Sequence, residues 1–107
     1  MTKALLISVD GSVKRILVNG LKDLQAHVGG YIEGIYLNGG GNLAYVNEEG
    51  KLRGLPVNKR ASMFIHDKGA RVQTHDFIVG NMVIVGAPDE NGEDTDVSEA
   101  LCAELGL

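Results

Sequence analysis

The sequence predicts one α+β domain with a mostly antiparallel or mixed sheet of about five strands and two to three short helices, in the order ββα-ββα-β-α. Three observations predict it. The chain has 107 residues, a length that suits a single core. β-prone runs follow one another across short turns. Amphipathic stretches with helical spacing come after the paired runs. Hairpins that lead into helices further predict that the helices cover one face of the sheet.

The first ββα unit begins with a hairpin over residues 3–18, whose two β-prone runs flank the turn signal Asp10-Gly11. Residues 21–28 follow with apolar side chains at helical spacing. We expect Asn19 to cap this helix and Gly29-Gly30 to end it. A helix this short is marginal in isolation, so it must dock on the sheet.

The second unit contains two more predicted strands, residues 31–37 and 43–46, joined by a glycine-rich turn. Gly34 interrupts the first of them, which suggests a bulge or a close approach by another backbone. The segment Asn47–Gly50 is a predicted turn, with Gly50 suited to a positive φ.

A second helix is predicted over residues 59–67, with Asn58 as its cap and Gly69 as its terminator. The segment before it, Lys51–Val57, is predicted to be extended, because Pro56 disfavours a helical conformation at the preceding residue.

The last third of the chain holds one confident strand and a terminal helix. Residues 81–85 are apolar on both faces, which places this strand in the centre of the sheet. The sequence leaves the secondary structure of residues 71–76 ambiguous. Residues 97–105 have a helical apolar stripe, and Asp96 is the predicted cap.

Charge divides the chain into a basic body and an acidic end. Residues 1–88 hold all ten Lys and Arg and seven acids, whereas residues 89–107 hold seven acids and no base. We expect residues 1–88 to form the α+β globular domain and residues 89–107 an acidic loop and helix packed on it. The acidic end either keeps the protein soluble or folds back over the basic stretch Lys51–Arg71, where it would compete with an anionic ligand.

Composition argues against several classes of function. The isoelectric point of 5.2 and the five aromatic residues are unlike a nucleic-acid-binding domain. The longest apolar stretches, such as residues 4–7, are four residues long, too short for a membrane helix or a secretory signal. The one cysteine, Cys102, excludes an internal disulfide framework. We therefore expect neither a membrane-spanning nor a disulfide-stabilised protein, and we expect neither a cofactor nor a metal.

Two glycine-containing segments resemble nucleotide-binding loops only superficially. Residues 39–44 can be aligned with the dinucleotide fingerprint, but a strand pattern follows where a helix would have to open. Gly50-Lys51 lacks the spaced glycine and the Ser or Thr of a phosphate loop. Both segments are predicted to be turns.

Acidic and histidine pairs supply the alternative of a small enzyme. His66-Asp67 and His75-Asp76 are nine residues apart and could meet in space, and Glu48-Glu49 could take part in acid/base work. Their spacing is not diagnostic of a metal site or a hydrolase. The simpler interpretation is a solvated helix end, a polar loop and a solvated turn, and we assign no catalytic residue.

The strongest constellation is the fourteen-residue run Asn47–Arg60, which contains two acids, four bases, two amides and a proline and ends at a predicted helix N-terminus. Helix starts attract anions through free backbone N–H groups, and Lys or Arg adds charge-assisted hydrogen bonds. The run is either a structural turn with a capped helix or a surface for an anion, a nucleotide or a partner. The candidate ligand- or partner-binding residues are Tyr31, Asn47, Glu48, Lys51, Arg53, Asn58 and Arg60.

This run, with residues 28–33 upstream and residues 80–86 downstream, resembles a family of small proteins from phages and bacterial mobile elements named domain of unknown function 3846. The resemblance extends from about Ala4 to Val85. It implies a cytoplasmic accessory protein, and it implies no reaction, cofactor or catalytic residue.

Three hypotheses follow. The first is a non-enzymatic binding module that engages a host protein or a small anionic, nucleotide-like ligand and so counters host regulation or defence. The second is a small hydrolase that uses the acidic or His-Asp pairs. The third is a structural or assembly protein, and a homo-oligomer is compatible with each of them.

Overall fold

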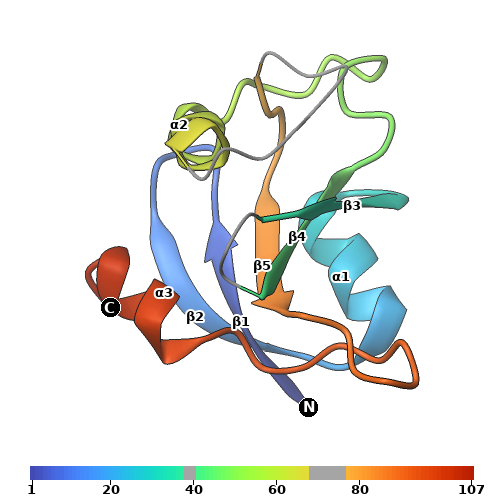
Figure 1. Cartoon of the computed structure of the whole chain (residues 1–107). Coiled ribbons are helices and arrows are strands. Elements are labelled where there is room, and N and C mark those ends of the chain that lie inside the picture. The colour runs from blue at the N-terminus through green and yellow to red at the C-terminus, as the bar shows by residue number, and fades with distance from the viewer. Residues whose placement is uncertain (38–40, 68–76) are drawn as a thin grey trace.

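The computed structural model describes residues 1–37, 41–67 and 77–107, which form a five-stranded antiparallel sheet with three helices (Figure 1). The predicted α+β class, the element order and the number of strands are confirmed. No helix in these ranges is long and apolar enough to cross a membrane. The elements are β1 (Thr2–Ile7), β2 (Val13–Val18), α1 (Gly20–Val28), β3 (Ile32–Tyr36), β4 (Asn42–Asn47), α2 (Lys59–Asp67), β5 (Met82–Gly86) and α3 (Glu99–Glu104).

The sheet has the strand order β2-β1-β5-β4-β3, and each neighbouring pair is antiparallel. The last strand in sequence, β5, therefore lies between the two hairpins, at the centre of the sheet. All five of its residues are buried, as its uninterrupted apolar sequence predicts. β2 and β3 form the two edges.

Helices cover both faces of the sheet, so the prediction of helices on one face is wrong. α1 lies on one side, and α2 and α3 lie on the other (Figure 1). The reason lies in β5, whose consecutive residues Val83 and Ile84 point to opposite faces of the sheet and are both fully buried. Two apolar clusters result. The first joins α1 to the sheet through residues such as Leu6, Leu24, Val28, Val83 and Val85. The second joins α2 and α3 to the sheet through residues such as Leu5, Phe64, Ile84, Leu101 and Cys102.

Gly34 lies in a regular ladder, so no bulge is present at this position. The register runs without interruption from Ile32 opposite Asn47 to Tyr36 opposite Leu43. A Cβ atom at Gly34 would lie 3.3 Å from a methyl group of Leu43. The close approach is therefore made by side chains of β4 and not by another backbone.

Residues 51–54 form tight turns, so the prediction of an extended conformation fails for this half of the segment. The amide of Arg53 donates to the carbonyl of Glu49 at 3.0 Å, and the amide of Leu55 donates to the carbonyl of Gly50 at 3.0 Å. Pro56 restrains only the residue before it. The extended portion is therefore confined to the residues around Pro56, and Val57 pairs with Val79 in an isolated bridge.

One predicted helix cap keeps its position without its side-chain hydrogen bond, and another is replaced by a neighbouring residue. Asn19 makes no side-chain cap, and its own amide instead donates to the carboxylate of Asp23. Asp96 accepts a hydrogen bond from the amide of Lys3, and Ser98 caps α3 by accepting from the amide of Leu101. α3 consequently starts at Glu99, two residues later than predicted.

The other predicted caps agree with the structure where it describes them. Gly29 ends α1 in the left-handed conformation, and its amide donates to the carbonyl of Gln25. Asn58 caps α2 by accepting from the amide of Ala61. The predicted terminator Gly69 lies outside the described residues.

Candidate functional site

The turn that follows β4 is anchored by the side chain of Asn47. This side chain is buried, its Nδ2 donates to the carbonyl of Val28 at 3.1 Å, and its Oδ1 accepts from the amide of Glu49 at 2.8 Å. The first bond reaches the last residue of α1, and the second closes the turn. Asn47 therefore fixes the turn relative to the end of α1.

Gly50 holds the same turn against the core by close packing. It does not adopt a positive φ, so the conformational reason expected for this glycine is wrong. A Cβ atom at Gly50 would lie only 2.6 Å from Cγ2 of Val79, a separation that real Cβ atoms do not adopt. Gly54, with φ of +67°, is the glycine in this turn that needs the left-handed region.

The turn presents an apolar side chain to solvent. Leu52 is 88% exposed. Arg53 lies beside it, and its Nη1 donates to the carbonyl of Gly29 at 3.1 Å. Tyr31 is 63% exposed, and its carbonyl accepts from the amide of Glu48 at 2.8 Å. Four of the predicted site residues, Tyr31, Asn47, Glu48 and Arg53, are thus brought together where α1 and β4 end.

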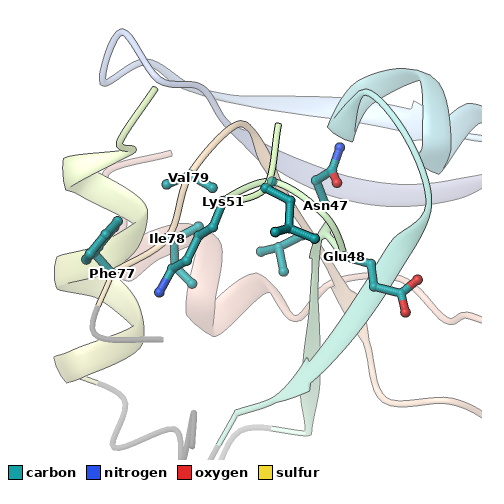
Figure 2. A pocket seen from close by; sticks show the side chains of 9 residues that line it. Asn47, Glu48, Lys51, Phe77, Ile78 and Val79 are labelled. Carbon is teal, nitrogen blue, oxygen red and sulfur yellow. The ribbon is translucent and has the colours of Figure 1, made fainter. Parts of the chain in front are cut away.

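A narrow cleft of about 50 Å³ lies behind the turn, between it and the segment 77–79 (Figure 2). The ammonium group of Lys51 lies 4.3 Å from the centre of the Phe77 ring, a cation–π contact. Figure 2 shows Glu48 pointing away from Lys51 and out of the cleft. The cleft is far smaller than the roughly 300–1,000 Å³ of a typical small-molecule pocket.

Asn58 and Arg60 lie at the start of α2, apart from the turn. Asn58 is fully buried, and its Nδ2 donates to the carbonyls of Ile7 and Gly80, both at 2.9 Å. Arg60 is exposed, and its Nη1 donates to the carbonyl of Gly11 at 3.1 Å. The predicted run therefore divides into two parts, one at the end of α1 and one at the β1–β2 turn.

An open depression of about 580 Å³ accompanies this second part of the run. Bases and exposed apolar side chains share its lining with one acid. The lining residues are Val9, Asp10, Gly11, Val57, Lys59, Arg60 and Met63.

The residues of the enzymatic alternative do not form a cluster in the described ranges. Glu48, His66 and Asp67 are exposed, while His75 and Asp76 lie outside the described residues. Within residues 1–37, 41–67 and 77–107 there is no group of three His, Cys, Asp or Glu side chains that could hold a metal ion.

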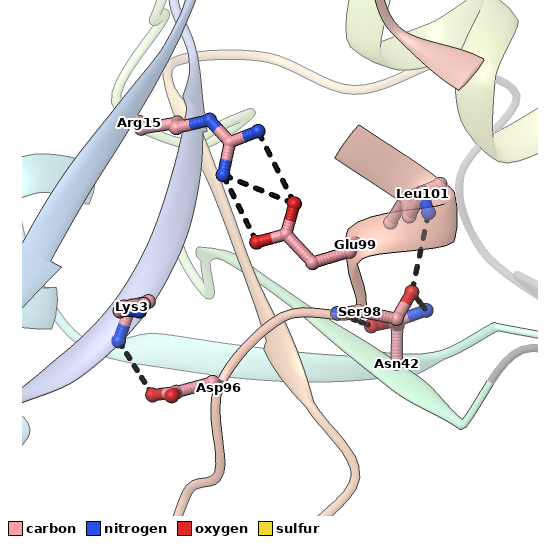
Figure 3. Close-up of polar contacts among 7 residues, drawn as sticks. All are labelled: Lys3, Arg15, Asn42, Asp96, Ser98, Glu99 and Leu101. Atoms are coloured by element: carbon pink, nitrogen blue, oxygen red, sulfur yellow. Dashed lines mark hydrogen bonds and ion pairs between the residues drawn. The ribbon is translucent and has the colours of Figure 1, made fainter. Parts of the chain in front are cut away.

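The acidic C-terminal segment packs at the end of the sheet where β1 begins and β4 starts, and Asp96 accepts a hydrogen bond there from the amide of Lys3 (Figure 3). Asn42 and Ser98 exchange two hydrogen bonds, which join α3 to the start of β4. Glu99 forms an ion pair with Arg15 at 3.1 Å. These contacts attach the segment to β1, β2 and β4, and its fold-back over Lys51–Arg71 stays a prediction.

Contacts of this acidic segment shift the pKa values of ionisable groups, and those of Glu99 and Tyr45 are examples. Hydrogen bonding to the Arg15 guanidinium, with its positive charge, lowers the pKa of Glu99. Burial raises the pKa of Tyr45, and so does its 2.6 Å hydrogen bond to the Asp94 carboxylate. Both contacts attach the segment to the sheet.

Sequence reasoning missed two participants of the site, Leu52 and Phe77. Leu52 lies between two bases in a run singled out for its charges, and nothing in the sequence around it indicates that this leucine is exposed. Phe77 is distant in sequence, and contacts such as the bridge between Val57 and Val79 bring its segment to the turn.

Comparison with known proteins gives one relationship. No curated protein and no solved structure matches the chain. Residues 1–106 match the family described as Domain of unknown function (DUF3846), which is almost the full length of the chain. The chain therefore belongs to the DUF3846 family.

Proposed function

We propose that this protein is a non-enzymatic binding module that engages another protein through the turn after β4. We call its surface the recognition face and define it as Tyr31, Glu48, Lys51, Leu52 and Arg53. The observation that carries the proposal is Leu52, which is 88% exposed on a turn held by Asn47 and Gly50. Because the backbone of the turn is already held in place, a partner that covers Leu52 need not order this segment first.

The composition of the recognition face supports a protein partner. Tyr and Arg are enriched where protein interfaces concentrate their binding energy. The Arg53 guanidinium uses Nη1 toward Gly29 and carries further N–H donors for a partner carboxylate. The partner expected from this chemistry has an apolar pocket for Leu52 and an acidic group beside it.

The resemblance to small proteins of phages and mobile elements supports a cellular setting for this binding. A protein encoded by a phage or mobile element would act in the cytoplasm of its host cell, and its partner would then be a host protein of regulation or defence. This part of the proposal rests on family context alone.

Affinity capture from host lysate with quantitative mass spectrometry tests the proposal. The wild-type protein is compared with Leu52→Asp and with the matched control Leu21→Asp, which alters a leucine of similar chemistry, 55% exposed, on α1. We expect a specific partner whose recovery falls at least ~10-fold for Leu52→Asp, a loss of about 1.4 kcal/mol, and is unchanged for Leu21→Asp. Equal recovery with all three proteins would contradict the proposal.

A small anionic ligand is a second candidate, and the depression at the start of α2 favours it. Lys59 and Arg60 line this depression beside the first turn of α2. Thermal-shift measurements with inorganic phosphate and with nucleotides test it, because a ligand at 100 Kd stabilises the fold by about 2.7 kcal/mol. A stabilisation that Lys59→Ala with Arg60→Ala abolishes would support this candidate, and no shift with any anion would remove it.

A further inference from the structure

We infer that the outer edge of β3 is an interface at which a second copy of this chain pairs antiparallel with the first. Among the described residues no segment pairs with this edge, because β3 is the last strand of the sheet beyond β4. The β3 edge adjoins the recognition face, because Tyr31 precedes Ile32, and pairing through this edge requires no partner at the recognition face.

The hydrogen-bonding groups of the β3 edge follow from its pairing with β4. The carbonyl of Tyr31 accepts from Glu48, and the amide of Leu37 donates to the carbonyl of Asn42. In an antiparallel ladder such inward-bonded residues alternate with outward-facing ones. The amides and carbonyls of Ile32, Gly34 and Tyr36 therefore point away from the sheet.

These three residues are self-complementary about a two-fold axis at Gly34. In the antiparallel pairing that uses all of them, Gly34 faces Gly34 of the second copy, and Ile32 faces its Tyr36. Each directly opposed pair of outward-facing residues exchanges two N–H···O bonds. A two-fold interface of this kind closes on itself as a dimer.

The side chains fit this pairing. Ile32 packs against the α1-side cluster and shares its face of the sheet with Tyr36, which is 70% exposed. The pairing sets the Tyr36 ring beside Ile32 of the second copy, an aromatic–β-branched pair that stabilises antiparallel sheets. Gly34 lies between Ile32 and Tyr36 in each copy, and because it has no side chain the two backbones can approach each other there.

Charge distinguishes this edge from the opposite one. On β2 the outward-facing residues are Val13, Arg15 and Leu17, because the amide and carbonyl of Lys3 turn away from β2 toward Asp96 and Val97. The equivalent self-pairing of β2 would set Arg15 against Arg15, which is unfavourable. Basic side chains commonly protect edge strands from such pairing, and β3 carries none.

Sedimentation velocity tests the inference on the full chain over a range from about 1 μM to about 1 mM. We expect a reversible dimer of twice the 11.4 kDa chain mass. Tyr36→Lys should weaken it at least ~10-fold, and Leu17→Lys, the matched control on the β2 edge, should not. A monomer at every concentration would overturn the inference, and so would a dimer weakened by Leu17→Lys and indifferent to Tyr36→Lys.

Disulfide trapping gives a second readout that does not depend on a disrupting variant. Opposed residues of a hydrogen-bonded antiparallel pair have Cα atoms about 5.5 Å apart, within disulfide range. Gly34→Cys should form a covalent dimer on mild oxidation, while Arg15→Cys, at the position that would face itself if two β2 edges paired, should not. The native Cys102 is fully buried and does not compete. Equal trapping at the two positions would contradict pairing through β3.

Discussion

The side-chain amide of Asn47 donates a 3.1 Å hydrogen bond to the carbonyl of Val28, and so joins the end of β4 to the last residue of α1. The same side chain closes the turn by accepting from the amide of Glu49. One buried residue therefore places the recognition face relative to the helix and the sheet.

Replacing Asn47 by Ala should destabilise the fold by about 1–3 kcal/mol, because a buried carbonyl and an amide lose their partner. Chemical denaturation measures this loss. The matched control Asn91→Ala alters an exposed asparagine and should leave the free energy of unfolding within about 0.5 kcal/mol of wild type. Equal stability of the two variants would show that the Asn47 contacts are not needed.

We predict that Asn58 stabilises the fold through its side-chain amide nitrogen as well as by capping α2 with its side-chain oxygen. Asn58→Asp keeps an oxygen that can cap α2 but sets a carboxylate against the carbonyls of Ile7 and Gly80. We expect this substitution to cost at least as much unfolding free energy as Asn58→Ala, about 2 kcal/mol or more. If thermal and chemical denaturation show Asn58→Asp to be as stable as wild type, the cap is the only role of this residue.

Gly50→Ala should destabilise the protein by about 1–3 kcal/mol through overpacking against Val79. In the Val79→Ala background the penalty should shrink by about 1 kcal/mol or more, which a double-mutant cycle measures. Gly54→Ala is the control, since the space around Gly54 is open and its cost comes from a positive φ. Additive effects of the Gly50 and Val79 substitutions would contradict the packing account.

The ion pair between Arg15 and Glu99 predicts a pH dependence. Because the pKa of the folded-state Glu99 carboxyl is lowered, its contribution to stability is present above the unfolded pKa of about 4.3 and is lost as pH falls through the folded value. Carboxyl NMR titration should show Glu99 titrating at a higher pH in Arg15→Gln than in wild type. An unchanged titration would show that the pair does not form in solution.

The fold was largely predictable because its signals are local. The Asp10-Gly11 turn, the Asn58 cap and the apolar run of β5 each specify a conformation within a few residues. Asn19 precedes α1 as predicted but makes no side-chain cap, and the cap of α3 was mispredicted because Ser98, two residues after Asp96, caps that helix. Asp96 is drawn away from α3 by Lys3, a residue 93 positions distant in sequence.

The site was less predictable because its parts depend on contacts between distant segments. Asn47 and Asn58 were proposed as binding residues, and both are buried with their side-chain amides bonded to backbone groups. A single sequence does not distinguish an exposed asparagine from a buried one. The prominence of Leu52 arises from a turn whose geometry depends on the distant Val79, which no local pattern encodes.

Site-specific photo-crosslinking in the host cell tests the proposed recognition face most directly. A photoreactive amino acid is placed at position 52 in one protein and at position 21 in another, so that each probe replaces an exposed leucine. The account predicts a discrete crosslinked protein for position 52 that is absent for position 21 and is lost when Arg53→Glu is added. No discrete product at position 52, or the same product at both positions, would contradict it.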